Sequence, residues 1–206
     1  MTIILLVLSA AGGLGALLAA PAIDWPFNEG LLGAALLIGA AFAARLHWER
    51  RARARGDDPG APEREVWAAM VGTAMICGFL IVVLLTPGSE VHTRTGGTGG
   101  WQTWTMFIGA VAAWALVRKP EVPRDERDRA IRALGDKVGY FSVCLLLVLL
   151  ALFLGFAPPD QRVRLTHWLL GNTLIAVIML ATLTQQVAQL FAYHRDARAA
   201  TTDSLQ

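Results

Sequence analysis

The chain has 206 residues, of which 55% are hydrophobic and 17% are charged, and its mean hydropathy is +0.49. Soluble domains carry about 25% charged residues, so this composition excludes an ordinary soluble domain and favours helices packed in lipid. The net charge is only +2. The acidic residues Glu49, Asp57 and Asp58 lower the local positive charge of the basic run 50–55, so no direct contact with nucleic acid is expected. Cys77 and Cys144 lie inside apolar runs, which indicates buried thiols rather than a disulfide framework.

Six apolar stretches have, or nearly have, the length of about 20 residues that a helix needs to cross a bilayer. In chain order they cover about 3–20, 30–46, 66–86, 102–117, 138–157 and 168–193. No basic residue precedes the first stretch, so we expect a span there rather than a cleaved secretory signal. The fourth stretch is the shortest, and tryptophans, which favour the headgroup level, support it as a span. We predict an all-α, polytopic integral membrane protein with six transmembrane helices in a single domain, 1–206.

The basic residues fall on one side of this predicted topology. Fifteen of the 18 lysine and arginine residues lie in 45–65, 118–137 and 194–206, whereas Arg94, Arg162 and Arg164 lie in the other connections. Cytoplasmic connections of membrane proteins hold the excess of basic residues. We therefore predict a multi-pass protein of the bacterial cytoplasmic (inner) membrane with both termini in the cytoplasm.

Two cytoplasmic connectors share a pattern of alternating charge. "VPRDERDRAIRALGDKVGYF" (122–141) places charges of both signs beside an apolar span. Such a pattern is typical of a solvated helix with pairs four residues apart, such as Asp128 with Arg132, but it also fits a surface for a specific partner. The earlier connector ends in a similar acidic–basic–acidic trio, which suggests three stacked helical hairpins, although shared topology alone would also produce it. The candidate partner-binding residues are Arg124, Asp125, Glu126, Arg127, Asp128, Arg129, Glu63, Arg64 and Glu65.

The sixth span carries a polar stripe. At 3.6 residues per turn its polar side chains fall within an arc of about 140°. These groups avoid lipid, so they either make hydrogen bonds to a neighbouring helix or line a solute cavity that opens to the cytoplasm. The stripe consists of Asn172, Thr182, Gln185, Gln186 and Gln189.

Ionisable residues are absent from the middle of every predicted span. Such residues mark proton relays and voltage sensors, so their absence counts against a proton-driven carrier, a rhodopsin-like pigment protein and a voltage sensor. This absence does not count against a pore for neutral solutes. Neither a nucleophile elbow nor a phosphate-binding loop after a strand is present, so no enzyme activity and no catalytic residue are predicted.

The four histidines raise the hypothesis of a haem-binding redox subunit. His47 and His194 lie at inner helix ends, and His92 and His167 lie on the outer side. However, His167 and His194 are 27 residues apart, about 40 Å along a helix, which exceeds the hydrocarbon thickness of about 30 Å. Metal-ligand spacings such as His-x-x-x-His are also absent. We therefore predict no cofactor and no metal.

The segment 118–150 resembles part of a family of small prokaryotic integral membrane proteins of undefined function. The resemblance rests on a "DER" element beside the membrane, Asp125, Glu126 and Arg127, followed by Ile131 and another span. Members are often encoded near helix-turn-helix regulators, which implies a regulatory role at the inner face. This chain departs from the family in having six predicted spans rather than a smaller number.

The leading functional hypothesis is a non-enzymatic membrane protein. Its inner loops would bind or sequester a cytosolic partner, such as a regulator, or assemble in a membrane complex. The alternative is a carrier or channel for a small neutral solute, lined by the polar stripe. A haem-binding subunit comes third. The predicted partners are the lipid bilayer, a cytosolic protein and a second copy of the chain.

Overall fold

The protein forms a bundle of α-helices. The computed structural model describes residues 1–23, 25–55, 60–87, 89, 91–92, 99–118, 125–156, 158 and 166–203. These ranges contain helices and no strand, so the predicted all-α class is confirmed. The six helices are α1 (Thr2–Leu18), α2 (Glu29–Arg55), α3 (Ala61–Leu85), α4 (Gly99–Val117), α5 (Glu126–Phe156) and α7 (His167–Asp203).

Four of the helices, α2, α3, α5 and α7, are long and apolar enough to cross a membrane. The other two, α1 and α4, are apolar but shorter. At 17 and 19 residues they fall within the lower part of the range of about 17–25 residues that spanning helices show. The structure therefore fits a membrane location.

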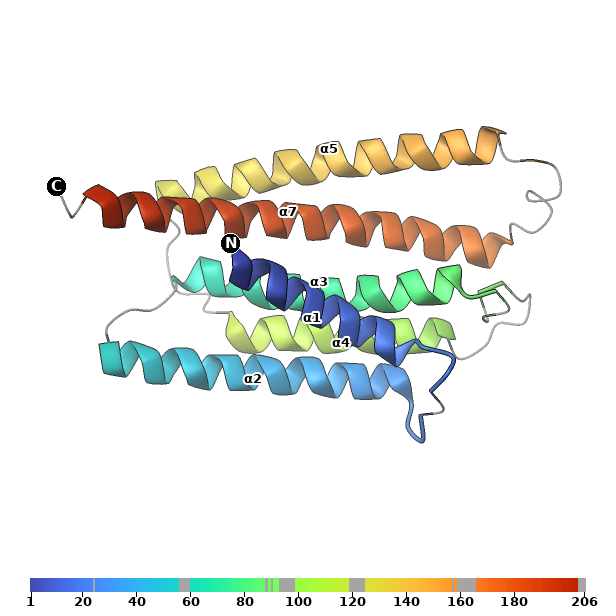
Figure 1. Cartoon of the computed structure of the whole chain (residues 1–206), viewed down its shortest axis with the longest axis horizontal. Coiled ribbons are helices and arrows are strands. Elements are labelled where there is room, and N and C mark those ends of the chain that lie inside the picture. Colours follow the sequence, from blue (N-terminus) through green and yellow to red (C-terminus); the bar gives the residue numbers. More distant parts are fainter. Residues whose placement is uncertain are drawn as a thin grey trace.

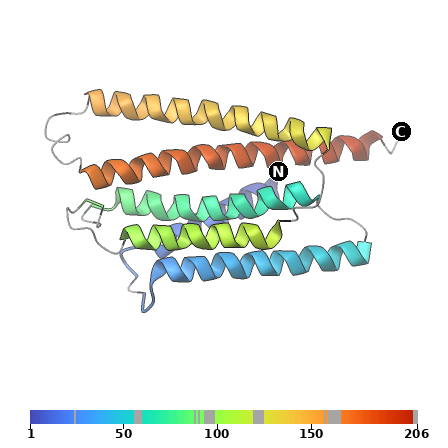
Figure 2. The same ribbon diagram turned by 180° about the vertical axis from the view of Figure 1, so that it is seen from behind.

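Helix α3 lies at the centre of the bundle. It packs against α1, α4 and α7, while α2 packs against α4 and α5 packs against α7 (Figure 1). The view from behind shows the same order of long helices, with α1 crossing on the far side (Figure 2). Consecutive helices α3 and α4, and α5 and α7, form hairpins, but α1 and α2 make few contacts with each other. The predicted stack of three hairpins is therefore not confirmed.

Close approaches at glycine explain why α1 packs against α3 rather than against α2. A Cβ on Gly15 would collide with the backbone of Met75, and one on Gly78 would collide with the backbone of Gly12. Backbones this close exclude any larger side chain, and small residues at helix interfaces are the main means of tight packing in lipid. In the same way α2 and α4 meet where Gly109 lies against Ala34.

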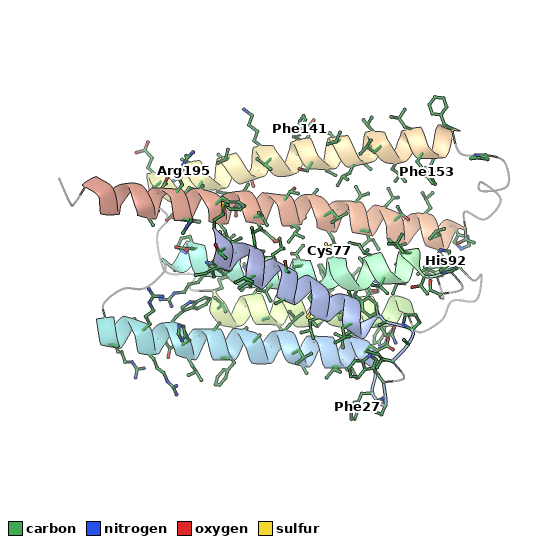
Figure 3. The ribbon with its side chains drawn as sticks, viewed as in Figure 1. Phe27, Cys77, His92, Phe141, Phe153 and Arg195 are labelled. Carbon is green, nitrogen blue, oxygen red and sulfur yellow. The ribbon has the colours of Figure 1, made fainter. Side chains whose placement is uncertain are left out.

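The charged helix ends gather at one end of the bundle. The Met1 ammonium lies 2.8 Å from Nε2 of His194, so the N-terminus and the last turns of α7 are neighbours. Arg45 of α2 donates from Nη1 to the carbonyl of Leu116 at the end of α4. Figure 3 shows Arg195 at this end, and Phe27 and His92 at the other. We call the end with Arg195 the basic end. It contains the ends of α2, α4 and α7 and the starts of α3 and α5.

The glycine contact between α1 and α3 generates a stability prediction. Gly15→Ala should lower the melting temperature in detergent, because the added methyl meets backbone that no side-chain rotation can move; overpacking costs about 1–3 kcal/mol. Gly13→Ala is the matched control on the same helix, since a Cβ there has no neighbour within 4 Å. It should leave the melting temperature unchanged or raise it. Equal melting temperatures for the two variants would contradict the packing described here.

Candidate functional site

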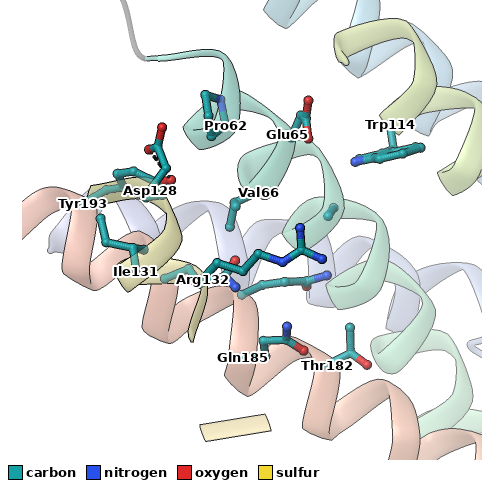
Figure 4. Close-up of a pocket in the computed structure, with 13 residues that line it drawn as sticks. Pro62, Glu65, Val66, Trp114, Asp128, Ile131, Arg132, Thr182, Gln185 and Tyr193 are labelled. Atoms are coloured by element: carbon teal, nitrogen blue, oxygen red, sulfur yellow. Dashed lines mark hydrogen bonds between the residues drawn. The ribbon is translucent and has the colours of Figure 1, made fainter. Parts of the chain in front are cut away.

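A cavity of about 220 Å³ lies at the basic end between α3, α5 and α7 (Figure 4). Trp114 of α4 also lines it. The cavity brings together two groups of residues that are far apart in the sequence, the polar stripe of α7 and charges from both connectors. Its polar and charged lining residues are Glu65, Asp128, Arg132, Thr182, Gln185, Gln186, Gln189 and Tyr193. We call it the polar pocket.

Part of the polar stripe serves the contact between α7 and α5. Gln185 donates from Nε2 to Oδ1 of Asp136 on α5 at 2.7 Å. The Gln185 side chain also lies against Gly139, and the Gln189 side chain lies against Gly135. The two glycines of α5 thus form a shallow face on which the glutamines of α7 pack. The stripe therefore contributes both to the contact between α5 and α7 and to the lining of the polar pocket.

Gln186 is the exception within the stripe. It lines the polar pocket, only 9% of its surface is exposed, and its Oε1 accepts no hydrogen bond from any described residue. An unpaired buried polar group costs about 1–3 kcal/mol, and such groups are rare in folded proteins. A hydrogen-bond donor that enters the pocket and meets this oxygen would recover that cost.

The other two residues of the stripe hydrogen-bond within their own helix. Thr182 donates from Oγ1 to the carbonyl of Ile178 while lining the polar pocket. Asn172 donates from Nδ2 to the carbonyl of Trp168 and lines a different cavity near the other end of α7. Asn172 therefore does not belong to the polar pocket.

The first turn of α5 is tied to the end of α7. Oδ1 of Asp125 accepts the backbone N–H of Asp128 at 2.7 Å, which caps the helix. Oδ1 of Asp128 accepts the Tyr193 hydroxyl at 2.9 Å. Arg127 pairs with Asp196 at 3.3 Å, and its guanidinium lies 5.7 Å from the centre of the Tyr193 ring. Sequence reasoning missed the partners Tyr193 and Asp196, because contacts between helices leave no local pattern.

The predicted pair of Asp128 with Arg132 is not found among the described residues. Asp128 bonds instead to Tyr193, and Arg132 is exposed and lines the pocket. In Figure 4 its side chain extends from α5 between Glu65 of α3 and Gln185 of α7. Glu126 and Arg129 are exposed on the same turns of α5. Arg124, also predicted for a partner surface, lies outside the described residues.

The trio Glu63, Arg64 and Glu65 does not form the solvated connector that the sequence suggested. Helix α3 begins at Ala61, so the trio lies on its first turns. Arg64 is 5% exposed and lies 5.5 Å from the centre of the Trp48 ring, and Glu65 is buried in the wall of the pocket. Glu63 accepts a hydrogen bond from Nε1 of Trp67 at 3.4 Å.

The histidines lie at both ends of the bundle. His194 contacts the Met1 ammonium, and Nδ1 of His92 lies 2.9 Å from the Ser89 hydroxyl. Within the described ranges, no three side chains of His, Cys, Asp or Glu are grouped closely enough to hold a metal ion.

Comparisons of the chain with protein-family models, curated proteins and solved structures find no match. The resemblance of 118–150 to membrane proteins with a "DER" element stays a prediction.

The Tyr193 hydroxyl should stabilise the junction of α5 with α7. Tyr193→Phe removes its hydrogen bond to the Asp128 carboxylate and should cost about 1.5–3 kcal/mol, the range for hydrogen bonds to charged groups. The measurement is the melting temperature in detergent. Tyr140→Phe is the matched control, because Tyr140 is 73% exposed on α5, and it should have no effect. A Tyr193→Phe variant as stable as this control would show that the junction does not depend on the bond.

Proposed function

We propose that this protein is an integral membrane protein that binds a small polar ligand in the polar pocket and catalyses no reaction on it. The observation that carries the proposal is the Gln186 carboxamide, which is buried in the pocket wall with an unpaired acceptor. The pocket volume of about 220 Å³ has room for a molecule of several heavy atoms, since a water takes up about 30 Å³.

The membrane arrangement is part of the proposal. We propose that all six helices cross a bacterial inner membrane, with both termini and the basic end in the cytoplasm. Four helices are long and apolar enough for this, and the other two are apolar. Basic residues at the basic end support the orientation, because positive charges resist translocation. The polar pocket would then open near the cytoplasmic headgroups.

Labelling with a membrane-impermeant thiol reagent tests this orientation. In a background without Cys77 and Cys144, Arg129→Cys should react only after spheroplasts are permeabilised, because the start of α5 lies in the cytoplasm. Phe27→Cys is the matched control, since Phe27 is 68% exposed at the opposite end, and it should react in intact spheroplasts. Labelling of Arg129→Cys in intact spheroplasts would reverse the proposed topology.

A second candidate function is the binding of a cytosolic protein or regulator at the basic end. The exposed charges of Glu126 and Arg129 favour it. Other charges of the predicted surface are engaged within the bundle: Asp125 caps α5, Arg127 pairs with Asp196, and Arg64 lies over Trp48. Because these charges are engaged within the bundle, the geometry supports the pocket better. Capture of a partner by wild type, lost when Glu126 and Arg129 are reversed in charge, would favour this second function.

Substitution of Gln186 separates ligand binding from packing. Gln186→Leu removes an unpaired polar group, so the ligand-free protein should melt at the same or a higher temperature. The same variant should lose molecules that co-purify with wild type in mild detergent, seen as mass adducts by native mass spectrometry. If Gln186 served only to bond helices together, the variant would melt at a lower temperature.

Thr184→Ala is the matched control for this experiment. Thr184 lies on the same helix, does not line the polar pocket, and donates to the carbonyl of Ala181 within α7. Its substitution should leave the adducts unchanged. A wild-type protein that carries no adduct, and whose melting temperature responds to no polar additive, would refute the proposed function.

A further inference from the structure

A groove runs along the bundle between α4 and α7, with α3 as its floor. Over the described residues, α4 and α7 both pack against α3 and hardly touch each other. Beyond the polar pocket, this gap contains a middle cavity of about 430 Å³ and a distal cavity of about 400 Å³. The cavities are adjacent, because neighbours share lining residues: Ala69, Trp114 and Thr182 at the first junction, and Ile76, Phe107 and Met179 at the second.

The groove changes from polar to apolar at Trp114. On one side lies the polar pocket, and on the other the middle cavity is lined almost wholly by apolar side chains. Arg118 holds its guanidinium 4.9 Å from the centre of the Trp114 ring, at the end of α4. Indole rings with a nearby cation are typical of the headgroup level of a bilayer. The polar pocket therefore lies at the depth of lipid headgroups, and the middle cavity at the depth of acyl chains.

The walls of the middle cavity are open to the bilayer. Val111 on α4 is 49% exposed and Ile178 on α7 is 57% exposed, and both line the cavity. From Glu65 in the polar pocket to Ile76 at the far end of the middle cavity, α3 rises about 16 Å over eleven residues. One leaflet of a bilayer has a hydrocarbon depth of about 15 Å, half of the full thickness. An acyl chain that begins at the polar pocket would fill the middle cavity.

The polar pocket defines the headgroup. The unpaired Oε1 of Gln186 requires a hydrogen-bond donor. The guanidinium of Arg132, for which the described residues supply no hydrogen bond or ion pair, is exposed at the pocket and can bind phosphate oxygens. Two carboxylates, Glu65 and Asp128, line the pocket against the one guanidinium of Arg132, so the lining carries a net negative charge that favours a cation. A headgroup with one phosphate and one N–H-bearing cation matches this lining.

We infer that the groove binds one phospholipid of the cytoplasmic leaflet whose headgroup carries a phosphate and a primary ammonium. Its phosphate lies at Arg132, its ammonium lies near Gln186 and Glu65, and one acyl chain lies in the middle cavity against α3. This inference rests on the proposed polar-ligand site and membrane orientation, and it names the class of ligand. A trimethylated ammonium has no N–H for Gln186, and a glycerol headgroup has no cation to match the net negative charge of the pocket lining.

The test compares headgroups on the same acyl chains. Full-length protein, stripped of lipid in detergent, is titrated with phosphatidylethanolamine, phosphatidylcholine or phosphatidylglycerol, and bound lipid is counted by native mass spectrometry. Phosphatidylethanolamine should bind about tenfold more tightly than either of the others, the factor that corresponds to one hydrogen bond involving a charged group. Gln186→Leu should remove this preference, and Arg132→Ala should weaken all three lipids. Equal affinity for the three headgroups in wild type would overturn the inference.

A second pair of variants tests the place of the acyl chain. Val111→Trp should fill the middle cavity and abolish lipid binding, while the chain-free headgroup glycerophosphoethanolamine should still bind to the polar pocket. Val148→Trp, on an exposed position of α5 outside the groove, is the matched control and should bind lipid as wild type does. If Val111→Trp instead converts a dimer into a monomer, the occupant is a second copy of the chain and the lipid inference fails.

The outcomes separate this inference from the proposed function. If glycerophosphoethanolamine or another soluble polar compound binds wild type as tightly as the whole lipid, and Val111→Trp changes nothing, the polar-ligand site stands and the lipid inference is overturned. If neither lipids nor soluble compounds bind, both are overturned.

Discussion

The close approach of other helices to α3 is the constraint on which the rest of the structure depends. Gly78 brings its backbone against α1, and Gly72 brings α3 against Ala110 of α4. In lipid there is no hydrophobic gain from helix association, so such backbone contacts decide which helices pair. Once α1 and α4 occupy two sides of α3, α7 packs on a third side. The gap between α4 and α7 is a consequence of this arrangement.

The central position of α3 also changes the role of its first turns. Residues Glu63 to Glu65 precede the apolar run, and on a peripheral helix they would reach water. Here Arg64 and Glu65 are buried because α2, α5 and α7 extend past them at the basic end. Buried charges are costly unless they have partners, and Arg64 finds one in the ring of Trp48. Glu65 becomes part of the pocket wall.

Sequence patterns predicted the all-helical class, since the length of an apolar run is a local property of the chain. Sequence patterns did not predict which helices pair. The similar charge patterns around Glu63 and Glu126 suggested three hairpins. In the structure, backbone contacts at Gly15 and Gly78 decide the partner of α1. The pocket also needed the structure. Gln186, Arg132 and Glu65 line it from three different helices, and no spacing along the chain reveals that they share a pocket.

The charge balance of the polar pocket argues for a ligand with both signs of charge. Two carboxylates, Glu65 and Asp128, and one guanidinium, Arg132, line it. A multiply charged anion would be repelled by the carboxylates, and a simple cation would leave the guanidinium without a partner. The unpaired Oε1 of Gln186 adds a need for a hydrogen-bond donor. Together these groups favour a zwitterion, and the apolar groove that continues from the pocket favours one with a hydrocarbon chain.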